Sequence, residues 1–182
     1  MSETDSPLRV AMIIGSTREG RFAPVVAGWF RRLAEQRTGI ELDVLDLVDG
    51  VRGDEVTPRL AAAEAYVVVT PEYNHSFPAP LKEAVDAHYT QWQAKPVGFV
   101  SYGGIGGGLR AVEQLRLVFA ELHAMTVRDS VSFHGAWSCF DEDGAPHDPT
   151  VVEGAAKGML DQLEWWGRAL RTAREAVPYG QG

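Results

Sequence analysis

The sequence is poor in the residues that build disulfide or metal scaffolds. Its 182 residues include a single cysteine, Cys139, so no disulfide can form within the chain and no thiolate cluster can hold zinc. The five histidines include no pair at the spacing that places two ligands on one helix face. We therefore expect no metal site.

Positive charge and long apolar runs are also scarce. Seventeen basic residues stand against twenty-five acidic ones, and the net charge of −8 disfavours a nucleic-acid-binding protein, which needs a basic face. No apolar run approaches the length that crosses a bilayer, and residues 1–7 lack the basic and apolar regions of a secretory signal. We expect a soluble, cytoplasmic protein with neither nucleic acid nor membrane as a partner.

The chain does contain a regular alternation of short apolar runs and helical patterns. The apolar runs predict strands at Arg9 to Ile14, Ile40 to Leu45, Ala65 to Val69, Val97 to Val100 and Thr126 to Phe133. Helical sequence separates them, and a long helix is expected near the C-terminus, from about Val151 to Arg174. The alternation predicts one doubly wound α/β domain over residues 1–182, with a parallel sheet covered on both faces.

The loop after the first predicted strand has the composition of a phosphate site. Ligands of such sheets bind beyond the carboxyl ends of the strands, and here the sequence is Gly15-Ser16-Thr17-Arg18-Glu19-Gly20-Arg21-Phe22. Glycine permits a tight turn, arginine binds phosphate oxygens, and the following helix N-terminus adds free amides. The segment lacks the P-loop ending and the dinucleotide glycines, so a monophosphate is favoured. The alternative is a polar turn capped by Ser16 or Thr17.

The loops after the third and fourth predicted strands suit a planar ligand. Residues 70–80 hold three prolines that stiffen the loop, with Tyr73 able to stack and Asn74 able to bind the edge of a heterocycle. Residues 103–108 contain five glycines in six positions, which permits close backbone approach to a flat molecule. The plain alternatives are an Asx-type turn in the first segment and simply a flexible loop in the second.

A relaxed dinucleotide-binding pattern overlaps the glycine-rich loop. Gly106, Gly108 and Ala111 match its small residues, and Asp129 follows at roughly the expected distance. Several loop residues separate the match from the preceding strand, and Asp129 falls inside the predicted fifth strand instead of at its end. The match is a weak signal for a nicotinamide-dependent dehydrogenase, which remains an alternative.

Taken together, the three loops resemble those of the NADPH-dependent FMN reductase family, which includes quinone, azo and chromate reductases. Gly-Ser-Thr-Arg, Thr-Pro-Glu-Tyr-Asn and Ser-Tyr-Gly-Gly occur in this order after strands one, three and four. The resemblance runs from about Arg9 to Phe133 and implies a flavodoxin-like, five-stranded parallel sheet of order 2-1-3-4-5. Two departures, Arg21 where many members have serine and Glu83 where they have asparagine, suggest a subgroup difference.

The resemblance also implies which residues hold FMN. The phosphate would be surrounded by Ser16, Arg18, Arg21 and Phe22. The isoalloxazine ring would be lined by Pro71, Glu72, Tyr73, Asn74, Ser101, Tyr102, Gly103 and Gly104. Since flavin carries the difficult chemistry, we expect no catalytic triad and no dedicated acid–base pair.

By the same resemblance the protein would be an enzyme that transfers hydride from NADPH or NADH through FMN to a flavin, a quinone or a similar small acceptor. One alternative is a flavodoxin-like electron carrier that binds FMN without reacting directly with nicotinamide. Another is a regulatory protein that keeps the fold and binds no flavin.

The resembling family commonly forms dimers and tetramers, and the sequence offers candidate contact residues. Trp165 and Trp166 are neighbours on the last predicted helix, so both cannot lie at the centre of one core stripe. Tyr89 and Trp92 follow the helix after the third strand. Large aromatics left over from a core are typical of protein interfaces, so we expect a homodimer or homotetramer.

Overall fold

The structure is a computed structural model that describes residues 6–53 and 55–180. The expectation about a secretory signal falls mainly on residues 1–5, outside this range. In chain order the elements are β1 (Leu8–Ile14), α1 (Ala23–Ala34), β2 (Ile40–Asp46), α2 (Val56–Ala62), β3 (Ala65–Pro71), α3 (Ala79–Asp86), β4 (Pro96–Gly103), α4 (Leu109–Glu121), β5 (Met125–Thr126), β6 (Val131–His134), the 3₁₀ turn η2 (Ala136–Ser138) and α5 (Pro149–Ala176).

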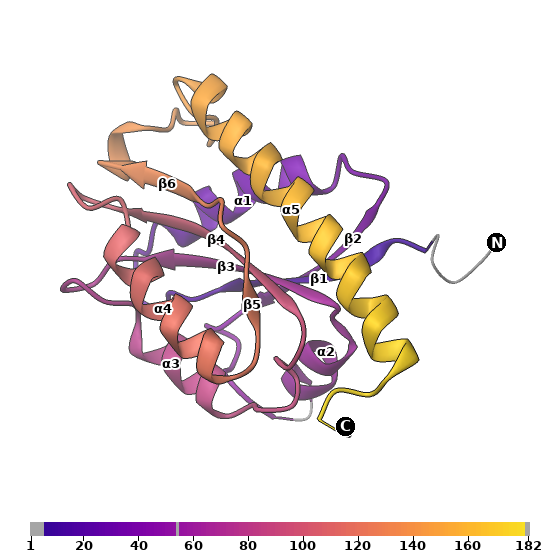
Figure 1. The fold of residues 1–182 in the computed structure, drawn as a ribbon. Coiled ribbons are helices and arrows are strands. Elements are labelled where there is room, and N and C mark those ends of the chain that lie inside the picture. The colour runs from indigo at the N-terminus through magenta and orange to yellow at the C-terminus, as the bar shows by residue number, and fades with distance from the viewer. Residues whose placement is uncertain (1–5, 54, 181–182) are drawn as a thin grey trace.

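The strands form one parallel sheet in the order β2-β1-β3-β4-β5, with β6 also paired to β4 (Figure 1). The predicted flavodoxin-like order is confirmed. Every residue of β3 and β4 is buried, which is why these two strands are continuous apolar runs without polar alternation. At the edge, β2 is partly exposed and alternates apolar with acidic residues.

The fifth strand is divided into two pieces. The sequence predicts a continuous strand from Thr126 to Phe133, but the structure has β5 and β6 with a bend between them. At the bend, the guanidinium of Arg116 in α4 donates to the carbonyl oxygens of Val127 at 2.6 Å and Arg128 at 3.0 Å. These two carbonyls are satisfied outside the sheet ladder, so the interruption of the strand leaves neither of them unpaired.

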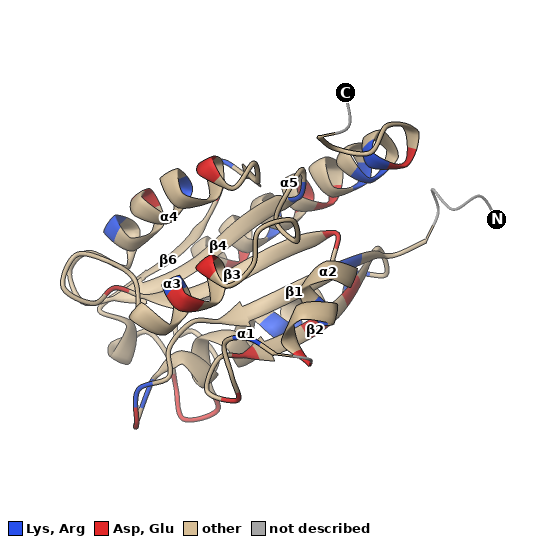
Figure 2. Cartoon of the chain, turned by 90° about the horizontal axis from the view of Figure 1, so that it is seen from below, with Lys and Arg blue, Asp and Glu red and all other residues tan. Residues whose placement is uncertain are grey.

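Helices cover both faces of the sheet. Helices α1 and α5 pack on one face, and α2, α3 and α4 pack on the other. Figure 1 shows α5 crossing the sheet as one long helix. Charged side chains lie mainly on helices and loops, and the central strands β3 and β4 contain none (Figure 2). The apolar interior therefore fixes the sheet, and polar chemistry is left to the loops at its ends.

One aromatic residue proposed above for an interface belongs to the core. Trp92 is completely buried, and its indole N–H donates to the carbonyl oxygens of Val85 at 3.1 Å and His88 at 2.9 Å. Its ring also packs edge-on against Tyr66 and Phe119. The expectation that Trp92 is left over from the core is therefore wrong.

Helix α5 begins earlier than predicted and is tied to the sheet near its far end. The carboxylate of Asp148 caps its N-terminus by accepting the N–H of Thr150 at 3.3 Å. Close to the C-terminus, buried Arg171 lies 3.5 Å from the carboxylate of Glu64, which also accepts the N–H of Arg9 at 2.9 Å. This ion pair fixes α5 against the start of β3 and β1.

Candidate functional site

The loops after β1, β3 and β4 meet beyond the carboxyl ends of the strands and border a cavity of about 360 Å³. Its walls are Arg18, Glu19, Gly20, Arg21, Phe22, Pro71, Glu72, Tyr73, Asn74, Tyr102, Gly103 and Trp137. Most residues nominated from the sequence are in this wall. The exceptions are Ser16, Ser101 and Gly104.

The loop after β1 presents free backbone donors. The N–H of Gly15 continues the strand ladder by donating to Val69 at 2.9 Å. Over the described part of the chain, the N–H groups of residues 17–20 donate to no protein acceptor. Helix α1 begins immediately afterwards and has no acidic residue in its first turn. Free amides beside a helix N-terminus form a site for an anion, and the exposed carboxylate of Glu19 is an opposing charge in the same loop.

Arg21 is not free to bind a ligand with its full charge. Its guanidinium forms two hydrogen bonds of 2.5 and 2.6 Å with the carboxylate of Asp46 at the end of β2. It also donates to the carbonyl oxygen of Ser16 at 2.6 Å. The bond to Asp46 raises the pKa of Arg21 above its ordinary value, against the effect of burial. Arg21 therefore braces the loop against β2 from within the cavity wall.

Arg18 has a different environment. Its exposed guanidinium lies over the ring of Tyr73, 4.2 Å from the ring centre, and has no carboxylate partner among the described residues. The hydroxyl of Tyr73 shares a 2.7 Å hydrogen bond with the completely buried hydroxyl of Ser16. Ser16 therefore positions Tyr73 from behind the cavity wall, and Arg18 is the cation that a bound anion could recruit.

The loop after β3 makes a tight hairpin turn. Asn74 and His75 have φ values of 50° and 67°, and Tyr73 and Ser76 exchange main-chain hydrogen bonds of 2.8 and 3.0 Å. Two consecutive positive φ angles define a type I′ turn, which asparagine tolerates better than most residues. Gln114 of α4 holds the turn by accepting from Ser76 at 2.6 Å and donating to His75 at 2.8 Å. Main-chain bonds, in place of an Asx-type turn, close this loop.

Glu72 connects that hairpin to the next loop. Its carboxylate is ion-paired with Arg110, whose backbone N–H in the first turn of α4 donates to it at 3.3 Å. Only 6% of the Glu72 side chain is exposed. A carboxylate at a helix N-terminus is electrostatically favourable, so the pair fixes the wall of the cavity.

The glycines after β4 divide into two groups. Gly108 has a φ of 87°, and a Cβ there would lie 2.5 Å from the Cβ of Ser101. Buried Ser101 donates to the carbonyl oxygen of Gly107 at 2.9 Å, so Gly107 and Gly108 pack the loop onto β4. In contrast, Gly103 lines the cavity, and a Cβ on Gly104 would meet no atom within 4 Å. Gly103 therefore contributes backbone to the cavity wall, and Gly104, just outside that wall, has open space beside it.

The dinucleotide pattern has no supporting geometry. Gly108 of this pattern packs directly against Ser101 of β4. Asp129 lies in the bend between β5 and β6 and not at a strand end, and its carboxylate pairs with Arg128 at 2.8 Å. The two halves of the pattern therefore do not form a nucleotide site together.

Comparison with known proteins agrees with the geometry. The sequence model of the NADPH-dependent FMN reductase family matches residues 8–138. The chain belongs to this family. It is 31% identical over 181 residues to the quinone reductase of Pseudomonas putida, covering 89% of this chain and 96% of that protein. It is 33% identical over 120 residues to an NAD(P)H-dependent FMN reductase of Schizosaccharomyces pombe, covering 55% of this chain and 60%, less than two thirds, of the yeast protein.

Solved structures share the fold of this FMN reductase family member. FerB, a flavoenzyme NAD(P)H:(acceptor) oxidoreductase from Paracoccus denitrificans, superposes with a TM-score of 0.68 at 21% identity, over 89% of this chain and 98% of that one. A flavodoxin from Pseudomonas aeruginosa gives a TM-score of 0.61 at 22% identity, over 90% and 99%. The family resemblance and the flavodoxin-like fold inferred from the sequence are both confirmed.

Within this family member, Tyr102 is set deep in the cavity wall. It is 3% exposed, and its ring lies 6.3 Å from that of Phe22. Its hydroxyl is buried and has no hydrogen-bond partner among the described residues. Burial, followed by the neighbouring Tyr73, raises the pKa of the Tyr102 phenol well above its ordinary value. The side chain is therefore a neutral wall of the site.

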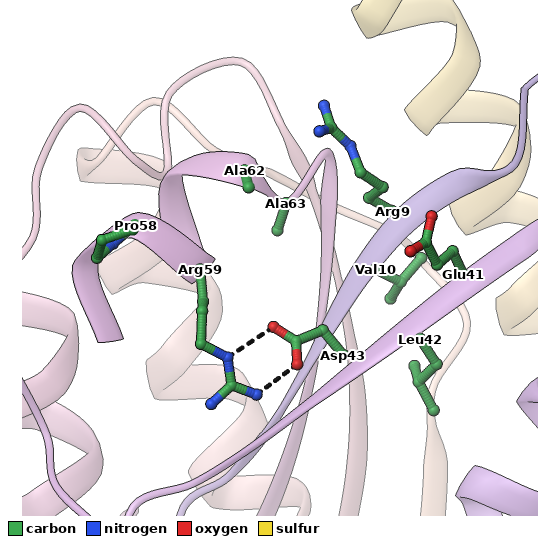
Figure 3. A pocket seen from close by; sticks show the side chains of 9 residues that line it. All are labelled: Arg9, Val10, Glu41, Leu42, Asp43, Pro58, Arg59, Ala62 and Ala63. Atoms are coloured by element: carbon green, nitrogen blue, oxygen red, sulfur yellow. Dashed lines mark hydrogen bonds and ion pairs between the residues drawn. The ribbon is translucent and has the colours of Figure 1, made fainter. Parts of the chain in front are cut away.

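A second hollow, of about 420 Å³, lies between β2 and α2 (Figure 3). Figure 3 shows Arg59 bridging to Asp43, and the same guanidinium donates to the exposed-edge carbonyl of Val44 at 2.7 Å. Arg9, at the rim, lies 3.5 Å from Glu64. Asp43 and Arg59 are thus paired across the hollow, and Arg59 covers part of the open edge of the sheet. Unlike the first cavity, this hollow gathers none of the family's loops.

The structure adds residues that the sequence reasoning missed. Glu19 and Gly20 lie inside the segment already singled out, but Trp137 comes from the turn η2 after β6. No motif marks Trp137, and only its size and its place after the last strand could have drawn attention to it. In the described ranges, 6–53 and 55–180, no group of His, Cys, Asp and Glu side chains is placed to hold a metal ion.

Proposed function

We propose that this chain binds FMN in the 360 Å³ cavity and transfers hydride from NADPH or NADH to a small acceptor such as a quinone or a flavin. The observation that carries the proposal is the meeting of the three family loops around one cavity at the carboxyl ends of β1, β3 and β4. The names of the relatives, an FMN reductase and a quinone reductase, support this class of reaction.

The residues of the cavity fit FMN in charge and in shape. The free N–H groups of residues 17–20, the exposed Arg18 and the N-terminus of α1 suit a phosphate. Gly103 offers backbone without a side chain, and the exposed amide of Asn74 suits the polar edge of a flat heterocycle. When bound, FMN would supply a two-electron centre that accepts and donates hydride.

The protein's own part in this reaction is to bind and to orient. Glu72 is paired with Arg110, and burial keeps the Tyr102 phenol neutral, so neither side chain in the wall is placed as a general base. The Ser16–Tyr73 hydrogen bond and the Glu72–Arg110 pair hold two loops in fixed positions around the ring site. This division of labour explains why no catalytic triad is needed.

Spectroscopy of the purified protein tests the proposal. After reconstitution, FMN should show shifted absorbance and quenched fluorescence. Anaerobic addition of NADPH, and of NADH in a separate sample, should then bleach the bound flavin. Failure to bind at micromolar FMN would rule out the flavin site. A flavin reduced by dithionite but untouched by both nucleotides would favour the electron carrier.

The location and assembly of the protein form part of the same proposal. A net charge of −8 and a single cysteine fit a cytoplasmic protein. Among the described residues, no helix combines the length and the apolar character needed to cross a membrane. Exposed Trp165 and Tyr89 favour a homodimer or homotetramer, because large aromatics on a surface commonly anchor protein contacts.

A further inference from the structure

Trp137 lies in the cavity wall without belonging to any of the three family loops. It sits on η2, directly after β6, and is 65% exposed. Within the described part of the chain its indole makes no ring contact with another aromatic side chain. Its indole therefore adds a large exposed aromatic surface to a cavity whose wall is otherwise rich in charged and polar side chains.

The backbone beneath Trp137 is fixed to the glycine-rich loop. The N–H of Gly135 donates to the carbonyl oxygen of Gly104 at 2.9 Å. The N–H and the hydroxyl of Ser138 both donate to the carbonyl oxygen of Gly135, at 2.9 and 2.8 Å. The adjacent Ala136 is completely buried. Trp137 is thus anchored relative to Gly103 and Gly104 while its side chain stays exposed.

The other aromatic rings of the wall are already engaged. Phe22 packs against Tyr102 and Phe140. Tyr73 has the Arg18 guanidinium over one face and its hydroxyl bonded to Ser16. Tyr102 is only 3% exposed. Among the rings that line the cavity, the indole of Trp137 is therefore the most exposed to solvent.

We infer that Trp137 is a specificity-determining residue that stacks on the planar electron acceptor. This inference rests on the proposed function and adds to it a residue that selects among the possible acceptors. Aromatic rings attract one another beyond the effect of area burial, and an exposed indole can receive and release a ligand that exchanges at every turnover. The enzyme therefore favours planar aromatic oxidants, such as quinones, over compact inorganic ones.

Steady-state kinetics of the FMN-loaded protein test this inference at saturating NADPH or NADH, whichever reduces the flavin. The acceptors are menadione, a planar quinone, and ferricyanide, a compact inorganic oxidant. Trp137→Ala should raise the KM for menadione about 3- to 10-fold, the range expected for one lost ring–ring contact, with kcat changed much less. The KM for ferricyanide should not change. Trp137→Phe should restore most of the menadione affinity.

A matched control and two further readouts separate stacking from other roles. Leu117 is an apolar residue of α4 that is 75% exposed and lies outside the cavity wall, so Leu117→Ala should leave both KM values unchanged. The Kd for FMN, measured by fluorescence, and the molar mass, measured by light scattering, should match the wild type in Trp137→Ala.

Distinct results would overturn the inference. An equal effect on both acceptors, or on neither, would exclude stacking on the acceptor. A weakened FMN Kd would make Trp137 a cofactor ligand, and a lowered molar mass would make it an interface residue. If the wild type binds no FMN, or neither nucleotide reduces its flavin, the proposed function fails and this inference fails with it. If the wild type turns over both acceptors but Trp137→Ala leaves the selectivity between menadione and ferricyanide unchanged, this inference alone fails.

Discussion

Arg18 and Arg21 follow β1 on the same short loop, yet their guanidinium groups have different surroundings. Arg21 is held by two hydrogen bonds to Asp46, and its charge is neutralised at close range. Arg18 rests on the ring of Tyr73 and, among the residues that the structure describes, forms no ion pair with a carboxylate. A neutralised arginine stabilises the loop, whereas an arginine without an acidic partner can form a charge-assisted hydrogen bond with an incoming phosphate.

We therefore expect Arg18→Ala to weaken FMN binding by about 1.5–3 kcal/mol, the usual worth of a hydrogen bond to a charged group. Riboflavin has no phosphate, so its affinity should hardly change. Fluorescence titration of both ligands measures the difference. Equal losses for the two ligands would mean that the mutation disturbs the fold.

Arg21→Ala supplies the contrasting case. Removing its guanidinium leaves Asp46 without its ion-pair partner, so the melting temperature should fall. The binding of FMN and of riboflavin should weaken together, because the loop itself loses its support. A loss confined to FMN would instead mean that Arg21 turns from Asp46 to the phosphate.

The glycine-rich loop permits a similar separation of structural and binding roles. Gly108→Ala should destabilise the fold by about 2–5 kcal/mol, because its φ of 87° is strained for alanine and the new methyl would collide with Ser101. The methyl group added in Gly104→Ala would meet no atom within 4 Å, so this variant should leave the melting temperature unchanged while weakening the binding of FMN. Thermal melts and FMN titrations of the two variants distinguish the roles. Unchanged FMN binding in Gly104→Ala would place the ring elsewhere.

Among the elements, the short helix α2 depends on a contact from outside itself. Two carbonyl oxygens of its last turn, at Leu60 and Ala61, accept hydrogen bonds from the ammonium of Lys95 at 3.4 and 3.0 Å. The same ammonium lies 3.2 Å from the hydroxyl of Tyr66. Burial, followed by the nearby positive charge of Arg174, lowers the pKa of Lys95 to about 8. The group that caps α2 therefore loses its proton more easily in the folded state than in the unfolded state.

This pKa gives a pH dependence with a definite sign. Between about pH 8 and pH 10 the unfolded chain keeps the Lys95 proton and the folded chain releases it, so the contribution of Lys95 to stability rises with pH. The rise should approach about 1 kcal/mol per pH unit in this window. Above pH 10 the raised pKa of Tyr66 acts in the opposite direction. This can be measured by urea unfolding of the wild type and of Lys95→Met at about pH 7.5, 8.5 and 9.5, which span this window. The free energy of unfolding should rise with pH only in the wild type. Parallel profiles would assign the pH dependence to other groups.

The elements also show what the sequence can and cannot predict. Strands β3 and β4, and β1 apart from the exposed Arg9, are buried and mainly apolar, and such runs can be predicted because each residue repeats the same preference. Helix α2 is seven residues long and buries only Leu60, so it leaves almost no periodic signal. The break between β5 and β6 depends on Arg116, which lies on a different element and reaches the break only in the folded chain.

The same contrast holds for the candidate site. Loops that carry recognisable residues, such as Arg18 and Tyr73, could be predicted because their chemistry is local. Trp137 could not, since its place in the cavity wall depends on the hydrogen bond between Gly135 and Gly104, more than thirty residues apart in sequence. The pairing of Arg21 with Asp46 is likewise set by the alignment of β1 with β2.

At the scale of the whole molecule, the sheet separates stability from ligand binding. The buried strands and the helices on both faces hold the loops of the carboxyl edge, and the Glu64–Arg171 pair ties α5 near the opposite end. Because the two functions lie at opposite ends of the strands, changes near Lys95 or Glu64 should affect unfolding more than FMN affinity.

The outer surface of α5 carries the features that a symmetric contact requires. Trp165 is 63% exposed and stands edge-on to Trp166, with ring centres 4.8 Å apart. Beside it, Arg168, Ala169 and Thr172 border a shallow hollow of about 340 Å³. In a two-fold contact the same patch appears on both subunits, so an anchor beside a recess can pair with its own copy.

We therefore expect light scattering at micromolar concentration to give at least twice the chain mass of 19.9 kDa. Trp165→Glu should shift the mass toward one chain, because it replaces a large aromatic anchor with a charge that an interface would have to desolvate. Leu117→Glu is the matched control, since it introduces the same charge at an exposed apolar position of α4 and should leave the mass unchanged. A wild type that is monomeric and fully active would show that the surface of α5 serves no assembly. A dimer unaffected by Trp165→Glu would move the contact to another face, with Tyr89 as the next exposed aromatic to test.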